Sequence, residues 1–436
     1  MTKPLKYREM MGMLEKTLEA LPEHRRGANG QYELKDAGLS AFSVFYMQTP
    51  SFLSWQQDME KRKGRNNARS VFGIKKIPSV EQIKNLLDPV DEQGLSPAFW
   101  EVYHALEARG QLRAYEGVKG TQLVSLDGTQ HHASQKIHCE HCRVTVRKER
   151  AYYEHQVLMA VLCAPEQAQV ICLEPEFITP QDGHDKQDCE QAAIKRWVRR
   201  HASEFTPWGV TILTDDLHCH QPTCALFIEH KMYFILTCKP DSHNTLYEEL
   251  ALLEQVEGAI DSQTVRRWNG RHHETWVYRW AEQLPLRRWP DALLVNWCEL
   301  TIFNESTGEQ IFHNAWATNH DVNEHEVAAI AASGRARWKV ENEGINVLKN
   351  HGYQFQHNYG HGQQHLANVL LCLLLLAFLV HTVLHLSCET YRAIRQALGA
   401  RRKFFNDLQA LTRYLYFDSW QQLLTYMFQG LELESG

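Results

Sequence analysis

Gln122-Leu123-Val124-Ser125-Leu126-Asp127-Gly128-Thr129 is the stretch that decides the fold, because it reads as an alternating strand that ends at a carboxylate. A second apolar stretch, residues 209–214, runs in the same way into Asp215 and Asp216. Buried strands rarely end in carboxylates unless a cation compensates their charge. Taken singly, Asp127-Gly128 is also typical of a turn, and Asp215 of a helix cap.

Strand and helix patterns alternate around these two stretches. Residues 155–163, 169–173 and 233–237 are apolar runs of strand length, whereas residues 185–201 have the amphipathic pattern of a helix. This order predicts an α/β fold with a buried mixed sheet and flanking helices.

Helical patterns lie on both sides of this α/β region. Ser79 and Gln82 fit a capping box, and residues 97–109 place their apolar side chains on one face. Half of the 12 tryptophans fall in one β-rich segment. We therefore expect five regions: a helical N-terminal domain (1–117), the first part of the α/β core (118–245), a Trp-rich β insertion (246–320), the second part of the core (321–386) and C-terminal helices (387–436).

Composition limits the class of protein. The chain of 436 residues is 44% hydrophobic and 22% charged, which excludes global disorder. Its net charge of −6 excludes a uniformly basic nucleic-acid coat but allows local basic patches. The 11 cysteines have no framework spacing, and no apolar segment follows the charged N-terminus, so we expect reduced thiols and a cytoplasmic protein.

One long apolar segment, residues 366–386, could be taken for a membrane span. Its unbroken apolar run covers only residues 369–380, whereas a span needs about 20 residues. Asn368, His381 and His385 interrupt its ends. The segment is therefore predicted to be a buried core helix, and no membrane partner is expected.

A third carboxylate, Glu341, lies in a helical pattern that starts near Ala328. Two or three carboxylates that converge at strand ends form the oxygen-rich site that Mg²⁺ prefers. Two such ions can clamp the attacking and leaving oxygens of an in-line phosphoryl transfer.

These three acids lie in motifs that resemble the DDE transposases of bacterial insertion sequences, which have an RNase H-like catalytic core. Residues 126–129 match the first-aspartate motif of that family. Residues 213–218 match the second, with His218 in the place of a common aromatic residue. Residues 337–349 are similar to the glutamate helix, and the Trp-rich segment lies where one branch of the family carries a β insertion.

The glutamate helix departs from the signature of that branch at two places. Arg337 stands four residues before Glu341, as the signature requires, but Gly334 takes the place of its tyrosine. Leu348 takes the place of its lysine, and Lys349 follows one residue later. At the second strand we prefer Asp215 over Asp216, because Asp215 directly ends the apolar stretch.

The resemblance implies a function. Asp127, Asp215 and Glu341 would be the catalytic residues and would hold Mg²⁺ or Mn²⁺ in a two-metal site, for cleavage of DNA at the ends of an element and transfer of the 3′-hydroxyl into target DNA. The partners would be the terminal repeats of the element and the target DNA, in a synaptic homodimer. A catalytically inactive, DNA-binding relative is the alternative.

Several basic and aromatic residues are candidates for DNA contact, besides the helical N-terminal domain. The alternative is that the basic residues form a solvated surface and that the tryptophans fill a small β core. The candidates are Arg337, Lys349, Trp268, Arg266, Arg267, Lys195, Arg196 and Arg199, with further basic clusters at residues 61–76 and 401–403.

Zinc is a second metal to consider. Cys139 and Cys142 form one C-x₂-C pair after the first aspartate, and Cys219 and Cys224 follow the second aspartate. If both loops leave the same edge of a parallel strand pair, the four thiols predict a structural zinc clip beside the acids. A zinc hydrolase built on the histidines of residues 357–365 is disfavoured, because that stretch lacks a zincin glutamate and contains two glycines.

Overall fold

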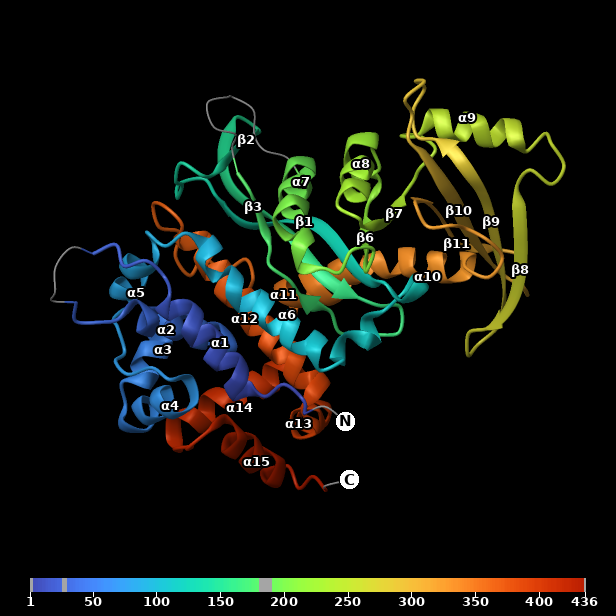
Figure 1. Ribbon diagram of the computed structural model, residues 1–436. Helices are drawn as coiled ribbons and strands as arrows, with labels where there is room; N and C mark the ends of the chain where they lie inside the picture. Colours follow the sequence, from blue (N-terminus) through green and yellow to red (C-terminus); the bar gives the residue numbers. More distant parts are fainter. Residues whose placement is uncertain (1–2, 26–29, 180–189, 435–436) are drawn as a thin grey trace.

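The computed structural model describes residues 3–25, 30–179 and 190–434. Within these residues, 11 strands form one mixed sheet, and helices pack around it (Figure 1). The prediction of an α/β fold with a mixed sheet is therefore confirmed. The helix predicted over residues 185–201 is described only from residue 190, because residues 185–189 lie outside the described ranges.

The first half of the sheet contains the strands predicted around the two aspartates. They run in the order β2-β3-β1-β6-β7, and β1 pairs parallel with β6, which pairs parallel with β7. Short strands β4 and β5 pair with β3. The strands are β1 (Gln122–Ser134), β2 (Arg143–Arg147), β3 (Arg150–Cys163), β4 (Ile171–Cys172), β5 (Glu176–Ile178), β6 (Val210–Thr214) and β7 (Tyr233–Thr237).

The first strand is longer than the sequence predicts. We expected it to end at Asp127, but β1 continues to Ser134, so that prediction is wrong. Its parallel pairing with β6 stops at Ser125, whereas its antiparallel pairing with β3 continues as far as Ser134 opposite Tyr153. Asp127 therefore lies just beyond the end of the pairing with β6, at a point where β1 is still paired with β3 on its other side.

The Trp-rich segment continues the same sheet beyond β7. Its four antiparallel strands follow in the order β11-β10-β9-β8, and β8 forms the outer edge (Figure 1). Trp297 and Trp316 are fully buried, as expected for core residues, whereas Trp268 and Trp289 are exposed. The strands are β8 (Asp261–Trp268), β9 (His273–Pro285), β10 (Leu294–Asn304) and β11 (Gln310–Thr318).

Helices of the central region pack beside the sheet. They are α7 (Glu190–His201), α8 (Gln221–Glu229), α9 (Asn244–Leu253), α10 (Val327–Arg335) and α11 (Asn346–Asn350). Between α10 and α11 the chain stays helical but changes pitch, with a 3₁₀ turn over Ala336–Trp338 and a π-helical turn over Val340–Ile345.

The N-terminal and C-terminal helices pack together as one helical body (Figure 1). Ser79 and Gln82 make both hydrogen bonds of the predicted capping box, at the start of α5. The N-terminal helices are α1 (Tyr7–Glu19), α2 (Leu34–Tyr46), α3 (Phe52–Met59), α4 (Arg62–Phe72), α5 (Val80–Leu87) and α6 (Ser96–Ala108). The C-terminal helices are α12 (Leu366–Ser387), α13 (Glu389–Leu398), α14 (Arg401–Tyr414) and α15 (Trp420–Gly430).

Helix α12 connects this helical body to the sheet. It is long and apolar enough to cross a membrane by composition, yet 89% of its most apolar window is buried inside the protein, against α2 and β4. His381 stacks on the Tyr46 ring and contacts the Tyr46 carbonyl oxygen through Nε2, at 2.8 Å. The burial agrees with the predicted core helix.

Candidate acidic site

The parallel pairing of β1 and β6 places two aspartates at corresponding positions. Ser125 lies opposite Leu213 in the register, and Asp127 and Asp215 each follow two residues later. Because both strands run in the same direction, both carboxylates lie at the same edge of the sheet. The predicted convergence of Asp127 and Asp215 follows from this register.

Glu341 reaches the same edge from the helical segment after α10. Ser125 of β1 donates a hydrogen bond of 3.0 Å to the carbonyl oxygen of Arg337, which fixes this segment against the strand. Arg337 Nη1 lies 2.9 Å from Glu341 Oε1 and 3.9 Å from Asp127 Oδ1. The Arg337 side chain is only 9% exposed, so one buried guanidinium lies between two of the three predicted acids.

The electrostatics of Asp127 show how crowded the carboxylates are. Burial, the largest cause, and the negative charges of Glu341, Glu190 and Asp215 together raise its pKa from the ordinary 3.8 to about 7, while Arg337 acts in the opposite direction. A carboxyl group with such a pKa lacks sufficient positive charge around it. The site is therefore electrostatically suited to a cation.

Glu190, at the start of α7, is a fourth carboxylate that the sequence did not single out. Its Oε1 accepts a 3.1 Å hydrogen bond from the backbone N–H of Gly128 and lies 3.1 Å from Nε2 of the buried His218. His218 Nε2 is also 3.5 Å from Asp215 Oδ1. A Cβ atom at residue 128 would lie 2.2 Å from Glu190 Oε2, so only glycine leaves room for this carboxylate.

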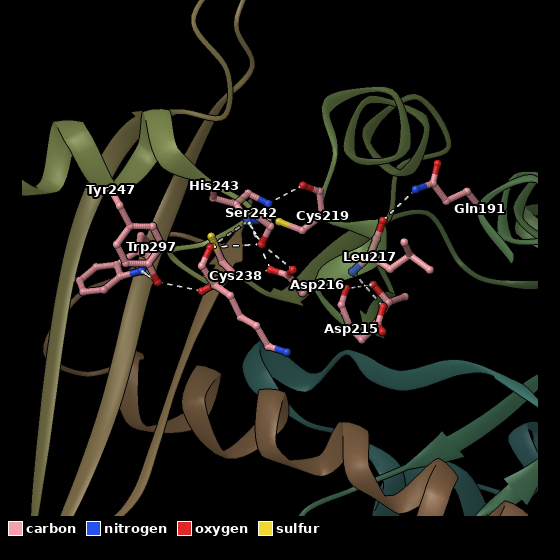
Figure 2. Close-up of polar contacts among 12 residues, drawn as sticks. Gln191, Asp215, Asp216, Leu217, Cys219, Cys238, Ser242, His243, Tyr247 and Trp297 are labelled. Atoms are coloured by element: carbon pink, nitrogen blue, oxygen red, sulfur yellow. Dashed lines mark hydrogen bonds and ion pairs between the residues drawn. The ribbon is translucent and has the colours of Figure 1, made fainter.

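The two neighbouring aspartates after β6 have different surroundings. Asp216 accepts hydrogen bonds from Lys239 N–H at 2.8 Å and from the Ser242 hydroxyl at 2.5 Å, and it lies 3.3 Å from His243 Nδ1. Asp215 accepts the local N–H of Leu217, has the 3.5 Å contact with His218 Nε2, and is 42% exposed. Figure 2 shows Asp216 turned toward Ser242 while Asp215 lies beside Leu217. The geometry favours Asp215 as the member of the acidic site.

The π-helical turn explains where the lysine after Glu341 lies. A π turn contains one residue more than an α turn, so the residues beyond it are displaced by one position around the helix. Leu348, the place expected from the resemblance, is fully buried, whereas Lys349 Nζ donates a 2.7 Å hydrogen bond to Thr129 Oγ1 on β1. The lysine thus reaches the acidic edge one residue late.

Gly334, at the place of the signature's tyrosine, packs closely against Trp316. A Cβ atom at Gly334 would lie 2.6 Å from the indole ring of Trp316. Trp316 of β11 therefore occupies the space into which a side chain from residue 334 would extend.

A basic cavity of about 1020 Å³ opens beside Lys349. It lies between the end of the glutamate segment and helices α13 and α14, and none of the described residues that line it is acidic. The cationic or titratable residues on its wall are Lys349, His351, His385, Arg395, Arg401 and Arg402. Arg401 and Arg402 belong to a cluster that the sequence indicated, whereas Arg395 was not predicted.

The other predicted DNA contacts do not gather at the acidic edge. Trp268 is 59% exposed on β8, the strand at the far edge of the sheet and six places from β1 in the sheet order, so it lies away from the acidic edge. Arg266 pairs with Glu305 at 2.7 Å, and Arg267 lies over the Trp276 ring at 4.2 Å. Trp338 is an exposed aromatic residue much nearer the acids, because it lies between Arg337 and Glu341 in the sequence.

The basic face of α7 is divided between structural and exposed side chains. Arg196 binds Glu176 Oε1 at 2.9 Å and the carbonyl oxygen of Phe177 at 2.8 Å, so its guanidinium holds α7 against β5. Lys195 is half-buried, and Arg199 is exposed. Of these three predicted residues, Arg199 is the one that solvent reaches most freely.

The predicted four-cysteine zinc clip does not form. Cys139 and Cys142 cluster with His155 and His361, whereas Cys219 clusters with Cys238 and His243. The reason is the length of β1: the loop with Cys139 and Cys142 starts beyond Ser134, while Cys219 follows the end of β6 almost directly. The two loops therefore leave the sheet at different positions along the strand direction.

Comparison with known proteins found no match that bears on this site. No protein-family model matches the chain, and no curated protein matches it. The functional assignment therefore depends on the geometry of the acidic edge and its basic surroundings.

Proposed function

We propose that the protein is a DDE-type transposase with an RNase H-like core, which cleaves DNA at the ends of its element and joins the freed 3′-hydroxyl to target DNA. The observation that carries this proposal is the convergence of Asp127, Asp215 and Glu341 at one edge of the sheet, beside a basic cavity. Parallel neighbours β1 and β6 are the strand arrangement expected for such a core.

The donor set fits Mg²⁺ or Mn²⁺. The acids at this edge offer carboxylate oxygens, which are the ligands that hard divalent cations prefer. The raised pKa of Asp127 supports this fit, because the carboxylates have too little positive charge among the surrounding side chains. When bound, a pair of such ions would supply charge neutralisation to the attacking and leaving oxygens of a phosphodiester.

The residues of the chain would divide the remaining work. Asp127, Asp215 and Glu341 would hold the cations, and Arg337 would orient Glu341 through their 2.9 Å contact. Hydrolysis would place the oxygen of water on phosphorus and release the 3′-oxygen of the cut strand as a hydroxyl. That hydroxyl would then attack a phosphodiester of the target, which releases another 3′-hydroxyl, so no covalent protein intermediate is needed.

The basic cavity supports DNA as the substrate. Lys349 connects the two regions, since its ammonium group binds Thr129, two residues beyond Asp127, and also lines the cavity. If a DNA strand passed from this cavity to the acids, Lys349, Arg401 and Arg402 would neutralise its phosphates. Because two element ends must be joined, the active assembly would be a dimer on DNA.

The test is cleavage of DNA that carries the repeats flanking the gene, with Mg²⁺ or Mn²⁺, by wild type and Glu341→Gln. Glu343→Gln is the matched control, because Glu343 lies on the same π-helical turn without a described ion pair. We expect metal-dependent 3′-hydroxyl ends from wild type and the control, and none from Glu341→Gln. If all three proteins bind these ends and none cuts, the inactive DNA-binding relative is the correct function.

A further inference from the structure

Four side chains far from each other in sequence bring their ligand atoms together outside the acidic site. They are Cys139 and Cys142, in the loop between β1 and β2, His155 on β3, and His361 in the loop between α11 and α12. The two Sγ and two Nε2 atoms all lie within 4.8 Å of one another. Cys142, His155 and His361 are buried, and Cys139 is half-buried.

The distances among these atoms are those of a tetrahedron around one ion. The Sγ atoms are 3.8 Å apart, the Nε2 atoms 3.0 Å, and three Sγ–Nε2 distances measure 3.3 to 3.5 Å. With Zn–S bonds of about 2.3 Å and Zn–N bonds of about 2.0 Å, the corresponding edges are about 3.8, 3.3 and 3.5 Å. A disulfide is excluded, because bonded sulfurs would be about 2.05 Å apart.

The surroundings of His361 favour coordination as well. Its Nδ1 lies 3.0 Å from the carbonyl oxygen of Gly362, to which it can donate its proton. With the proton on Nδ1, the lone pair of Nε2 points at the two thiols and at His155. Metal-bound histidines commonly have such a partner on the second ring nitrogen, which fixes the tautomer.

We infer that Cys139, Cys142, His155 and His361 bind one structural Zn²⁺. Two thiols lose their protons to solvent and two neutral imidazoles complete the shell, so that the site carries no net charge and no redox step occurs. Four protein ligands leave no open position, which is typical of a structural rather than a catalytic zinc.

The position of this site indicates what the ion would stabilise. It joins the antiparallel strands β1, which carries Asp127, and β3 to the irregular segment of residues 351–365 that follows α11. Irregular segments gain most from such a crosslink, because little backbone hydrogen bonding holds them otherwise. The inference does not rest on the proposed catalytic activity.

A second group, Cys219, Cys238 and His243, supplies an internal control. There, His243 Nε2 already contacts the Cys219 carbonyl oxygen at 2.7 Å, and its Nδ1 lies 3.3 Å from Asp216 Oδ1, so both ring nitrogens have oxygen partners (Figure 2). This group has no imidazole nitrogen left for a metal, and we expect it to stay metal-free.

The experiment is metal analysis of the full-length protein by inductively coupled plasma mass spectrometry, for wild type, Cys142→Ser, His361→Gln and the control Cys238→Ser. We expect about one zinc per chain in wild type and Cys238→Ser, and less than about a tenth of that in the two ligand variants. No zinc in wild type, stoichiometric iron in its place, or unchanged zinc in both ligand variants would overturn the inference.

Cobalt provides a second readout that needs no folded variant. Wild type stripped of metal and loaded with Co²⁺ should show the strong visible absorption of a tetrahedral site and thiolate-to-cobalt charge transfer in the near ultraviolet. One equivalent of Zn²⁺ should abolish both. A spectrum typical of six-coordinate Co²⁺, without thiolate bands, would contradict the four-ligand site even if zinc copurifies.

Discussion

Lys349 Nζ donates a 2.7 Å hydrogen bond to Thr129 Oγ1, which joins the end of the glutamate segment to the strand of Asp127. Burial lowers the pKa of Lys349, while the nearby Asp127 acts in the opposite direction. A partly desolvated ammonium group at this place is available to a phosphate that approaches the acids from the basic cavity.

Replacement of Lys349 by Met should weaken DNA binding and cleavage without unfolding the protein. We expect kcat/KM for cleavage to fall roughly 10- to 100-fold, and the salt dependence of DNA affinity to lose about one unit of slope, because one phosphate contact is removed. Fluorescence anisotropy at several salt concentrations measures the slope. Lys119→Met, just before β1, which removes a lysine paired with Asp321 at 2.8 Å, is the control and should change neither quantity.

The two aspartates after β6 should separate activity from stability. Asp215→Asn should reduce cleavage more than about 100-fold, while the midpoint of unfolding stays near that of wild type, because asparagine also serves as a good N-cap. Asp216→Asn should keep most of the activity and lose about 1 kcal/mol of stability, because the charge-assisted bonds to Lys239 and Ser242 weaken. Urea denaturation and cleavage assays on both variants would show the reverse pattern if Asp216 were the member of the site.

Gly128→Ala tests the fourth carboxylate. The added methyl group would displace Glu190 from the backbone N–H of residue 128 and from His218, so we expect cleavage to fall roughly 10-fold or more. Gly12→Ala is the matched control, because apart from its chain neighbours and the helix's own backbone no atom lies within 4 Å of a Cβ there, and alanine favours the helix by up to about 1 kcal/mol. Equal activity of both variants would remove Glu190 from the site.

The central strands and the three acids could be predicted from the sequence because each depends on a local pattern. An apolar stretch of strand length indicates a strand at both β1 and β6, although only β6 ends directly before its Asp, and Arg337 with Glu341 four residues later share one helix face. The capping box of Ser79 and Gln82 is equally local. Such signals depend on neighbours within a few residues, which the sequence shows directly.

The residues that the sequence missed depend on tertiary contacts. Glu190 lies far along the chain from Gly128. In the sequence, their contact is indicated by no more than the glycine at residue 128, which leaves room for the carboxylate. The prediction of a four-cysteine zinc clip is wrong because β1 is longer than its apolar pattern indicates. Its length depends on the long antiparallel pairing with β3. The displacement of Lys349 depends on a π-helical turn, whose hydrogen bonding leaves no sequence signature as simple as a cap.

The acidity of Asp127 predicts how stability depends on pH when metal is absent. Its pKa is about 7 in the folded protein and near 3.8 in the unfolded chain, so the folded state holds a proton that the unfolded state releases. The stability contributed by that proton is complete below about pH 4 and is lost as pH rises to about 7. Asp127→Asn lacks this loss, so its melting temperature should match wild type near pH 4 and exceed it above pH 7. The corresponding difference in the free energy of unfolding above pH 7 should be at most about 4 kcal/mol.

Added Mg²⁺ should offset the loss of stability that wild type shows at high pH, and should not do so for Asp127→Asn. Divalent cations bind the deprotonated carboxylates, so added Mg²⁺ should raise the melting temperature of wild type more at pH 8 than at pH 5.5, and should barely change that of Asp127→Asn. Glu343→Gln should follow wild type under every condition. Differential scanning fluorimetry across pH, with EDTA or Mg²⁺, measures all three proteins together. If wild type and Asp127→Asn show parallel pH curves and equal responses to Mg²⁺, Asp127 holds neither this proton nor the cation.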